Sequence, residues 1–293
     1  MGDEVRCVWR GGALLGEGPA WDVHAGVLWF VDIKRHRVYR FDPADGGCQS
    51  WDAPAQVGWV LRADDGALLA GLQAGIARFD PITGHFEPVA APQPHPPHNR
   101  LNDATVAPDG SIWFGTMDDD QTLRTGRIFR FDGKAVTDSG IDPVTITNGP
   151  ALSPDGRRLY HVDTLGGTIW VVPIEGGQVS GPSRPFMTID PDDGHPDGVT
   201  VDSAGNVWVG LWGGFCARLY APDASMVREV RLPAANVTKV ALGGPDLTTA
   251  FVTTASVGLT DEALIAQPGA GHLYAFEADV PGQQLRPARA WQG

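Results

Sequence analysis

The sequence is poor in cysteine and in cations, and each scarcity excludes a class of protein. Its three cysteines, Cys7, Cys48 and Cys216, are widely spaced and form no Cys-x-x-Cys pair. A disulfide framework is therefore not expected, and the chain suits a reducing compartment. There are 22 Lys and Arg against 35 Asp and Glu, which gives a formal net charge of −13. Because this charge repels phosphate backbones, we expect no nucleic-acid partner.

Long apolar segments are missing as well. Nowhere do 18 apolar residues follow one another, so no membrane span and no membrane partner are expected. Residues 1–12 lack the basic start and the apolar run of a secretion signal. We therefore expect a cytoplasmic protein, and a monomer.

Glycine and proline are plentiful instead, with 38 and 24 residues, and they separate short apolar runs along the whole chain. Each run has the character of a buried strand, and successive runs start 40 to 48 residues apart. The runs begin at Leu28, Leu68, Ile112, Leu159, Val207 and Ala250. A period of this length indicates a repeat architecture, here with six units.

Each repeat contains further strand signals around its apolar run. A preceding apolar stretch is joined to the run by turn residues such as Pro108-Asp109-Gly110, which predicts a β-hairpin. In the segment that follows, apolar and polar residues alternate, as in a strand that is wet on one side. Such segments are Val38–Phe41, Ile76–Phe79, Arg127–Phe131, Ile169–Val172 and Ala217–Tyr220.

Six repeats of about four strands predict an all-β fold, a six-bladed β-propeller that occupies residues 1–293 as a single domain. A sandwich is the alternative, and a solenoid is disfavoured because no distinct capping repeats stand at the ends. The last repeat ends in a short Pro-rich tail, so we expect the spare strand Val5–Trp9 to complete its blade. The segment Leu259–Ala266 carries a capping signal and predicts one or two helical turns.

Polar residues stand at one phase of this repeat. Ten or eleven residues before the apolar runs lie Glu17, Gly58, Asn102, Asn148, Asp197 and Lys239, and five of these six are polar. Taken singly, several could be turn residues, since Asn-Gly and Asp-Gly are favoured turn pairs. Radial repetition, however, brings the start of each innermost strand to the mouth of the channel. We therefore expect these side chains to share one site.

Two carboxylates and one amide of this set, on Glu17, Asp197 and Asn148, offer only oxygen ligands. Hard divalent cations such as Ca²⁺, Mg²⁺ or Mn²⁺ prefer such ligands, and the affinity order of the metals keeps Zn²⁺ and Fe²⁺ among the candidates. We expect one metal ion at the mouth of the central channel. His161 lies inside an apolar strand and is interpreted as structural, whereas His195 has a more exposed pattern and is a candidate for the pocket wall.

Six motifs make the chain similar to one family. They are Leu15–Pro19, Asn99–Asp103, Gly115–Met117, Ile146–Pro150, Ser153–Gly156 and Pro196–Gly198. In this order they resemble the regucalcin/gluconolactonase (senescence marker protein) family over nearly the whole chain, and Asn236–Lys239 is most similar to bacterial sugar-acid lactonases. The resemblance implies a six-bladed propeller with one divalent metal at the channel mouth and the hydrolysis of sugar lactones.

The same resemblance implies roles for individual residues. Glu17, Asn148 and Asp197 match the metal ligands, and Arg100 and Asn102 match residues that contact the substrate. Asp120 stands where the family has a substrate-contacting glutamate, and it is a shorter acid. Lys239 is expected at the same level of a polar pocket and is taken as a further substrate-binding residue.

The chemistry of these residues agrees with a lactonase. A bound metal polarises an ester carbonyl and lowers the pKa of water, and Asp197 is placed to accept the proton of that water. We expect hydrolysis of an aldonolactone, such as xylono-, arabinono- or gluconolactone, to the free acid in oxidative sugar catabolism. No Gly-x-Ser-x-Gly motif is present, so acyl-enzyme chemistry is disfavoured. A phosphotriesterase-type propeller hydrolase and a non-enzymatic calcium-binding propeller remain the alternatives.

Overall fold

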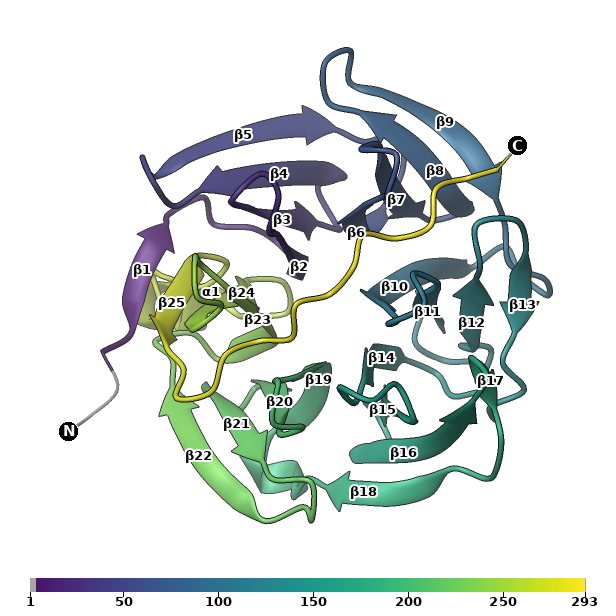
Figure 1. Ribbon diagram of the computed structural model, residues 1–293. Helices are drawn as coiled ribbons and strands as arrows, with labels where there is room; N and C mark the ends of the chain where they lie inside the picture. Colours follow the sequence, from purple (N-terminus) through teal and green to yellow (C-terminus); the bar gives the residue numbers. More distant parts are fainter. Residues whose placement is uncertain (1–3, 293) are drawn as a thin grey trace.

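The computed structural model describes residues 4–292, whose strands form six antiparallel sheets arranged in a ring (Figure 1). We number these sheets as blades 1 to 6 in the order in which the chain forms their innermost strands. The prediction of an all-β, six-bladed propeller is confirmed. Almost no helix is present, and within residues 4–292 no helix has the length and apolar character needed to cross a bilayer.

Blades 1 to 3 each contain four strands, paired in the order of the sequence. Blade 1 consists of β2 (Gly16–Asp22), β3 (Val27–Asp32), β4 (Arg37–Asp42) and β5 (Gly47–Asp52). Blade 2 consists of β6 (Val57–Arg62), β7 (Leu68–Leu72), β8 (Gly75–Asp80) and β9 (His85–Ala90). Blade 3 consists of β10 (Asn99–Val106), β11 (Ile112–Asp118), β12 (Ile128–Phe131) and β13 (Val136–Asp138).

Blades 4 and 6 depart from this plan. Blade 4 has five strands, β14 (Thr147–Leu152), β15 (Arg158–Asp163), β16 (Thr168–Glu175), β17 (Gln178–Val179) and β18 (Arg184–Thr188), because both β17 and β18 pair with the long β16. The 3₁₀ turn η1 (Pro191–Asp193) leads into blade 5, which contains β19 (His195–Val201), β20 (Val207–Trp212), β21 (Cys216–Tyr220) and β22 (Met226–Arg231). Blade 6 contains β23 (Asn236–Gly243), β24 (Thr249–Ala255), β25 (Leu273–Glu277) and the N-terminal β1 (Arg6–Trp9).

The predicted helical segment is present between β24 and β25 as α1 (Asp261–Ala266). Thr260 precedes it, and its side-chain oxygen accepts a hydrogen bond from the backbone N–H of Ala263. This is the N-cap interaction that the sequence signal implied. The prediction of a short helix is therefore confirmed.

The hairpin turns form where Asp and Gly were expected to reverse the chain. Between β10 and β11, Oδ1 of Asp109 accepts a hydrogen bond from the N–H of Ser111 at 3.0 Å. Gly110 in the same turn has a φ of 83°, a conformation that favours glycine. The turn residues that separate the apolar runs thus set the length of each strand.

Aromatic side chains fill the space between neighbouring blades. Trp59 of blade 2 lies against Phe114 of blade 3, with ring centroids 6.2 Å apart. Trp208 of blade 5 lies against Phe276 of blade 6, with centroids 5.3 Å apart. All four rings are buried. Because such rings remove large apolar areas from water, each blade is held by its neighbours.

The strand β1 joins the last blade of the ring to the first. It pairs antiparallel with β25, with Arg6 opposite Ala275, and so completes blade 6 as predicted. Trp9, its last residue, contacts Phe30 and Tyr39 of blade 1 with ring centroids 5.0 and 4.9 Å apart. The first strand therefore attaches blade 6 to blade 1 and closes the ring.

The C-terminal segment, residues 278–292, crosses the centre of the ring on the face shown in Figure 1, where it is yellow. Nε2 of Gln283 donates a hydrogen bond to the carbonyl oxygen of Val201 at 3.0 Å, and Ala288 pairs in parallel with Ala63. Both contacts lie at or just beyond the ends of innermost strands. The segment therefore lies over one end of the central channel.

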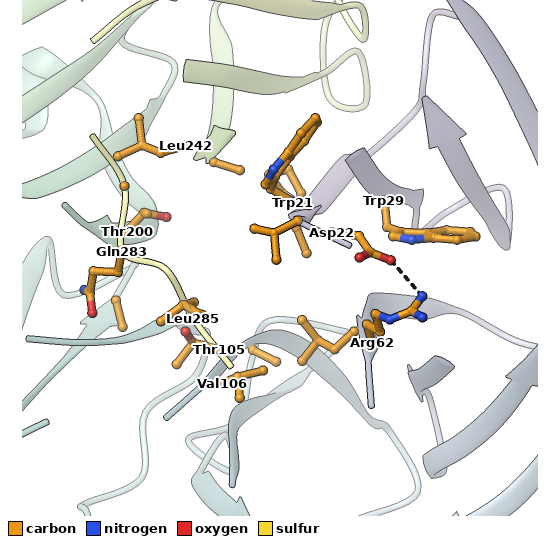
Figure 2. Close-up of a pocket in the computed structure, with 18 of the residues that line it drawn as sticks. Trp21, Asp22, Trp29, Arg62, Thr105, Val106, Thr200, Leu242, Gln283 and Leu285 are labelled. Atoms are coloured by element: carbon orange, nitrogen blue, oxygen red, sulfur yellow. Dashed lines mark hydrogen bonds and ion pairs between the residues drawn. The ribbon is translucent and has the colours of Figure 1, made fainter. Parts of the chain in front are cut away.

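Beneath this segment is a cavity of about 140 Å³ (Figure 2). Trp21, Thr105 and Thr200 line it from the innermost strands of blades 1, 3 and 5, and Leu285 lines it from the C-terminal segment. Lys239 of blade 6 also lines this cavity. The end of the channel next to the C-terminal segment is thus enclosed between the innermost strands and that segment.

Replacing Trp9 by Ala should lower the free energy of unfolding by about 2 kcal/mol, because Trp9 is half-buried and a fully buried Trp→Ala costs about 3–5 kcal/mol. Urea denaturation measures the change. Ile82→Ala is the control, since Ile82 is 94% exposed and a surface substitution changes stability by about 0.5 kcal/mol or less. Equal effects of the two substitutions would contradict the role of β1 in closing the ring.

Candidate active site

In each innermost strand the pairing register shifts at or next to the position that the repeat singled out. The pairing register shifts just after Glu17 in β2, after Asn148 in β14 and after Pro196 in β19. The other three innermost strands shift after Val57, Leu101 and Val237. A β-bulge bends its strand and redirects the neighbouring side chains, and bulges are frequent next to active sites. The six bulges lie at one level of the ring, at the opposite end of the innermost strands from the C-terminal segment.

Five ionisable side chains are buried at this level. They are Glu17, Arg100, Asp103, Asp197 and Lys239, and none is more than 5% exposed. Burial, and next the negative charge of Asp103, raise the pKa of Glu17 to about 7. Burial and the charges of Glu17 and Asp103 likewise raise the pKa of Asp197, while Arg100 and Lys239 act in the opposite direction. Such mutual effects require the charges to lie close together.

A chain of hydrogen bonds connects the predicted substrate residues to a predicted metal ligand. Nη1 of Arg100 donates to Oδ1 of Asn102 at 2.6 Å, and Nδ2 of Asn102 donates to Oδ1 of Asn148 at 2.9 Å. Nδ2 of Asn148 in turn donates to Oγ1 of Thr164 at 3.0 Å, which fixes the direction of the amide. An amide oxygen has two lone pairs, so Oδ1 of Asn148 can accept this bond and still face an ion.

Asp119, which sequence reasoning missed, holds Arg100 from the other side. Oδ1 of Asp119 accepts a hydrogen bond from Nε of Arg100 at 2.8 Å. Nζ of Lys34 and Nε2 of Gln56 donate to the same carboxylate, both at 2.8 Å. Burial alone would raise the pKa of Asp119, but the hydrogen bonds from Lys34 and Gln56 and the charge of Arg100 lower it to about 2. Loops of blades 1 and 3 and the connection between blades 1 and 2 thus meet at one carboxylate.

The predicted substrate residue Asp120 lies outside this network. Its side chain is 70% exposed, and its Oδ2 is 3.7 Å from Nδ1 of His98. Both residues lie in the turn after β11, where Asp119 is bonded to Arg100 and Asp120 is exposed. The sequence offers three consecutive acids here, Asp118–Asp120, and nothing in the pattern separates them. A substrate contact of Asp120 stays a prediction.

Lys239, the other predicted substrate residue, is paired with Asp103. Its Nζ donates to Oδ1 of Asp103 at 2.6 Å. The same oxygen accepts the N–H of Ala104 at 2.8 Å, whereas Oδ2 of Asp103 is buried and has no hydrogen-bond partner among residues 4–292. Burial raises the pKa of Asp103, and the charge of Lys239 opposes this effect. No sequence signal links these residues, which are 136 positions apart.

Gly58 occupies the sixth position of the ring without a side chain. A Cβ at this residue would lie 2.1 Å from the carbonyl oxygen of Asn102 and 2.9 Å from that of Leu101. The backbone of blade 3 therefore occupies the space that a blade 2 side chain would need. Because Gly58 has no side chain, the backbone of Asn102 can approach it this closely.

The two histidines of the sequence analysis are not part of the hydrogen-bonded cluster. His161 is buried within β15, and neither of its ring nitrogens has a partner among the described residues. Burial lowers the pKa of His161 to about 4, so it is a neutral strand residue, in agreement with its structural interpretation. His195 is exposed at the first residue of β19.

The donors of the cluster suit a hard divalent cation. Glu17, Asp197 and Asn148 supply carboxylate and amide oxygens, the ligands that such ions prefer. Within residues 4–292, no three Asp, Glu, His or Cys side chains form a ligand group by themselves. Binding at these residues would therefore depend on the amide oxygen of Asn148 and on water. A cation would also offset the repulsion that raises the pKa of Glu17 and of Asp197.

Comparison with known proteins identifies the family of this chain. Residues 15–256 match the model described as the SMP-30/Gluconolactonase/LRE-like region. The chain belongs to this family. Its SMP-30/gluconolactonase relatives include a 6-deoxy-6-sulfogluconolactonase of Pseudomonas putida, 31% identical over 283 residues that make up 96% of this chain and 97% of the relative. An L-arabinolactonase of Azospirillum brasilense is 32% identical, over 92% of this chain and 90% of the relative.

A solved member of the SMP-30/gluconolactonase group has nearly the same fold. It is a regucalcin from Agrobacterium tumefaciens, described as a calcium-binding protein. The two chains are 27% identical and superpose with a TM-score of 0.93, over 100% of this chain and 99% of the other. The resemblance to this family that the sequence motifs carried is therefore confirmed.

Without metal, this SMP-30/gluconolactonase family member should lose stability as the pH rises from about 4.5 to about 7. The pKa of Glu17 is raised from 4.5 to about 7, so in this window the folded protein keeps a proton that the unfolded chain has released. Stability then falls with rising pH, on the order of 3 kcal/mol over the whole window. The raised pKa of Asp197 acts in the same direction.

Melting temperatures in the presence of a chelator, measured across this pH range, test the expectation. Glu17→Gln removes the titrating group and should flatten the dependence. A saturating divalent ion should flatten it as well, because the ion favours the ionised carboxylate. An unchanged slope in Glu17→Gln would show that another group carries the effect.

Proposed function

We propose that this protein is a metal-dependent sugar lactonase, which hydrolyses an aldonolactone to the free aldonic acid. The observation that carries the proposal is the hydrogen-bonded chain from Arg100 through Asn102 to Asn148, because it joins the expected sugar-binding donors to an expected ligand of the ion. The names of the two lactonase relatives support the same substrate class. Xylono-, arabinono- and gluconolactone are the substrates that we expect.

Glu17, Asn148 and Asp197 would hold the ion. A divalent ion at these residues supplies stabilisation of the carbonyl oxygen as a Lewis acid and a lowered pKa for the attacking water. Ca²⁺, Mg²⁺, Mn²⁺, Zn²⁺ and Fe²⁺ all bind sites of this chemistry. The calcium-binding description of the Agrobacterium relative favours Ca²⁺ as the first ion to try.

Asp197 has the role of the general base in this proposal. It is buried at the centre of the cluster, and the positive charges of Arg100 and Lys239 counteract the rise of its pKa. These cations favour the ionised carboxylate, which is the form that accepts a proton from the attacking water. The protonated Asp197 would then return this proton to the ring oxygen as its bond to the carbonyl carbon breaks, which gives the free hydroxyl of the open-chain acid.

Arg100 and Asn102 have the role of fixed donors for the sugar ring. Nε and Nη1 of Arg100 bond to Asp119, to the carbonyl oxygen of Leu101 and to Asn102, which leaves Nη2 to donate to a substrate hydroxyl. Because the guanidinium is held on both sides, little freedom is lost when the substrate binds. Such positioning lowers the entropic part of the barrier.

A panel of aldonolactones tests the function directly, with acid release followed before and after chelation. We expect turnover above spontaneous hydrolysis with the ion present, loss of turnover on chelation and recovery when the ion is added back. An organophosphate triester in the panel tests the phosphotriesterase alternative. Ion binding without turnover of any lactone would reject the lactonase and leave the calcium-binding propeller.

Two substitutions of Asp197 separate its two roles. Asp197→Ala should lose both the ion and nearly all turnover. Asp197→Asn keeps an oxygen ligand but has no base, so it should retain ion while kcat falls by roughly 10²- to 10⁴-fold, the usual contribution of a general base. Elemental analysis and steady-state kinetics measure the two effects, after subtraction of spontaneous hydrolysis. An Asp197→Asn variant with full ion content and unchanged kcat would place the base elsewhere.

Arg100→Ala is the contrasting variant in the same assay. Arg100 is expected to bind the ring in the ground state and in the transition state alike, so its loss should chiefly raise KM. The ion content should stay close to that of the wild type. A fall in kcat at unchanged KM would instead assign Arg100 to the chemical step.

A further inference from the structure

The Asp103–Lys239 ion pair is buried in the active-site cluster, yet the proposed reaction gives Asp103 no role and uses Lys239 only through its charge. The exposed fractions are 2% for Asp103 and 5% for Lys239, and their charged atoms are 2.6 Å apart. Oδ2 of Asp103 has no hydrogen-bond partner among the described residues. Buried polar atoms in proteins are nearly always hydrogen-bonded, so this oxygen requires an explanation.

Asp103 and Lys239 lie close to the residues that would hold the ion. The negative charge of Asp103 acts on both Glu17 and Asp197, the two carboxylates that would hold the ion. Oδ1 of Asp103 already accepts hydrogen bonds from Nζ of Lys239 and the N–H of Ala104, so we take Asp103 as a neighbour of the ligands and not as a ligand. The stem of Lys239 is equally close: a Cβ on Gly198, the residue after Asp197, would lie 2.7 Å from Cβ and Cγ of Lys239.

The net charge of the cluster predicts how Asp103 and Lys239 would each affect the binding of a divalent ion. Glu17, Asp103 and Asp197 carry three negative charges, and Arg100 and Lys239 carry two positive charges, so one negative charge remains when all are ionised. Without Lys239 two negative charges would remain, and without Asp103 none would. Since ions are attracted in proportion to the net charge that they meet, the two residues should act on a divalent ion in opposite directions.

We propose that the Asp103–Lys239 pair sets the affinity of the ion site. Asp103 adds negative charge next to the direct ligands. Lys239 offsets that charge, so that the carboxylates stay buried after the ion has left and the ion binds reversibly. The inference rests on the proposed function only in taking Glu17, Asn148 and Asp197 as the ligands.

Calorimetric titration of the chelator-treated protein with Ca²⁺ and with Mn²⁺, without any lactone, tests the proposal. Asp103→Asn should weaken binding by about 10- to 100-fold, the usual effect of residues just outside the ligands, and Lys239→Met should strengthen it by a similar factor. In the double variant the net charge returns to that of the wild type, so its Kd should lie within about twofold of the wild-type value.

Asp109→Asn is the matched control. Asp109 also pairs with a cation, since its Oδ2 is 2.7 Å from Nη2 of Arg130, but it lies at the hairpin turn between β10 and β11. The same chemical change there should leave the Kd unchanged. Melting temperatures give a second measurement: Lys239→Met leaves the Asp103 carboxylate unpaired, so the ion-free variant should melt below the wild type and recover on ion addition.

The outcomes separate this inference from the proposed function. Opposite shifts of the two single variants, cancelled in the double variant, support the charge balance. Shifts in the same direction, or a double variant as weak as Asp103→Asn, overturn it. If one single variant does not fold, the other decides: a shift of its Kd in the stated direction supports the charge balance, and an unchanged Kd overturns it. A wild type that binds no ion removes the metal-dependent reaction itself, whereas unshifted variants of an ion-binding wild type remove only the role of the pair.

Discussion

The burial of ionised side chains at the mouth of the channel is the constraint on which the rest of the structure depends. Removing a charge from water costs several kcal/mol unless partners compensate for it. The partners here come from different blades: Glu17 from blade 1, Arg100 and Asp103 from blade 3, Asp197 from blade 5 and Lys239 from blade 6. Blades 1, 5 and 6 each contribute one charge without a partner of opposite sign from the same innermost strand. The ring therefore has to close for electrostatic reasons as well as for the packing of its aromatic side chains.

Much of the fold and part of the site could be predicted because they repeat. Each apolar run marks the same strand of its blade, and turn residues mark the same reversal, so the period specifies the blades. The phase of the period specifies which residues stand at the bulges, and Glu17, Asn148 and Asp197 were found in this way. A repeated pattern carries this information in each unit, so one irregular unit, such as blade 4 with its additional β18, does not hide it.

The rest could not be predicted, because it depends on contacts between units. Asp119 and Asp120 are adjacent acids in one turn, and the partners of Asp119, Lys34 and Gln56, lie 85 and 63 positions away. The pairing of Asp103 with Lys239 links blade 3 to blade 6 across the channel. The path of residues 278–292 over the ring has no repeat to reveal it. Patterns within a unit thus describe the scaffold, whereas the charge network depends on distances that only the closed ring defines.

The pairing of β1 with β25 also has a consequence for the synthesis of the protein. Arg6 and its partner Ala275 are separated in the sequence by almost all of blades 1 to 6. At about 5–20 residues per second, the ribosome needs on the order of tens of seconds to deliver the partner strand. During this time the sheet edge of β1 is open to pairing with other chains. A nascent chain that stalls before β25 would hold blades 1 to 5 and an unpaired β1, so the synthesis of β25 decides between a closed ring and an aggregate.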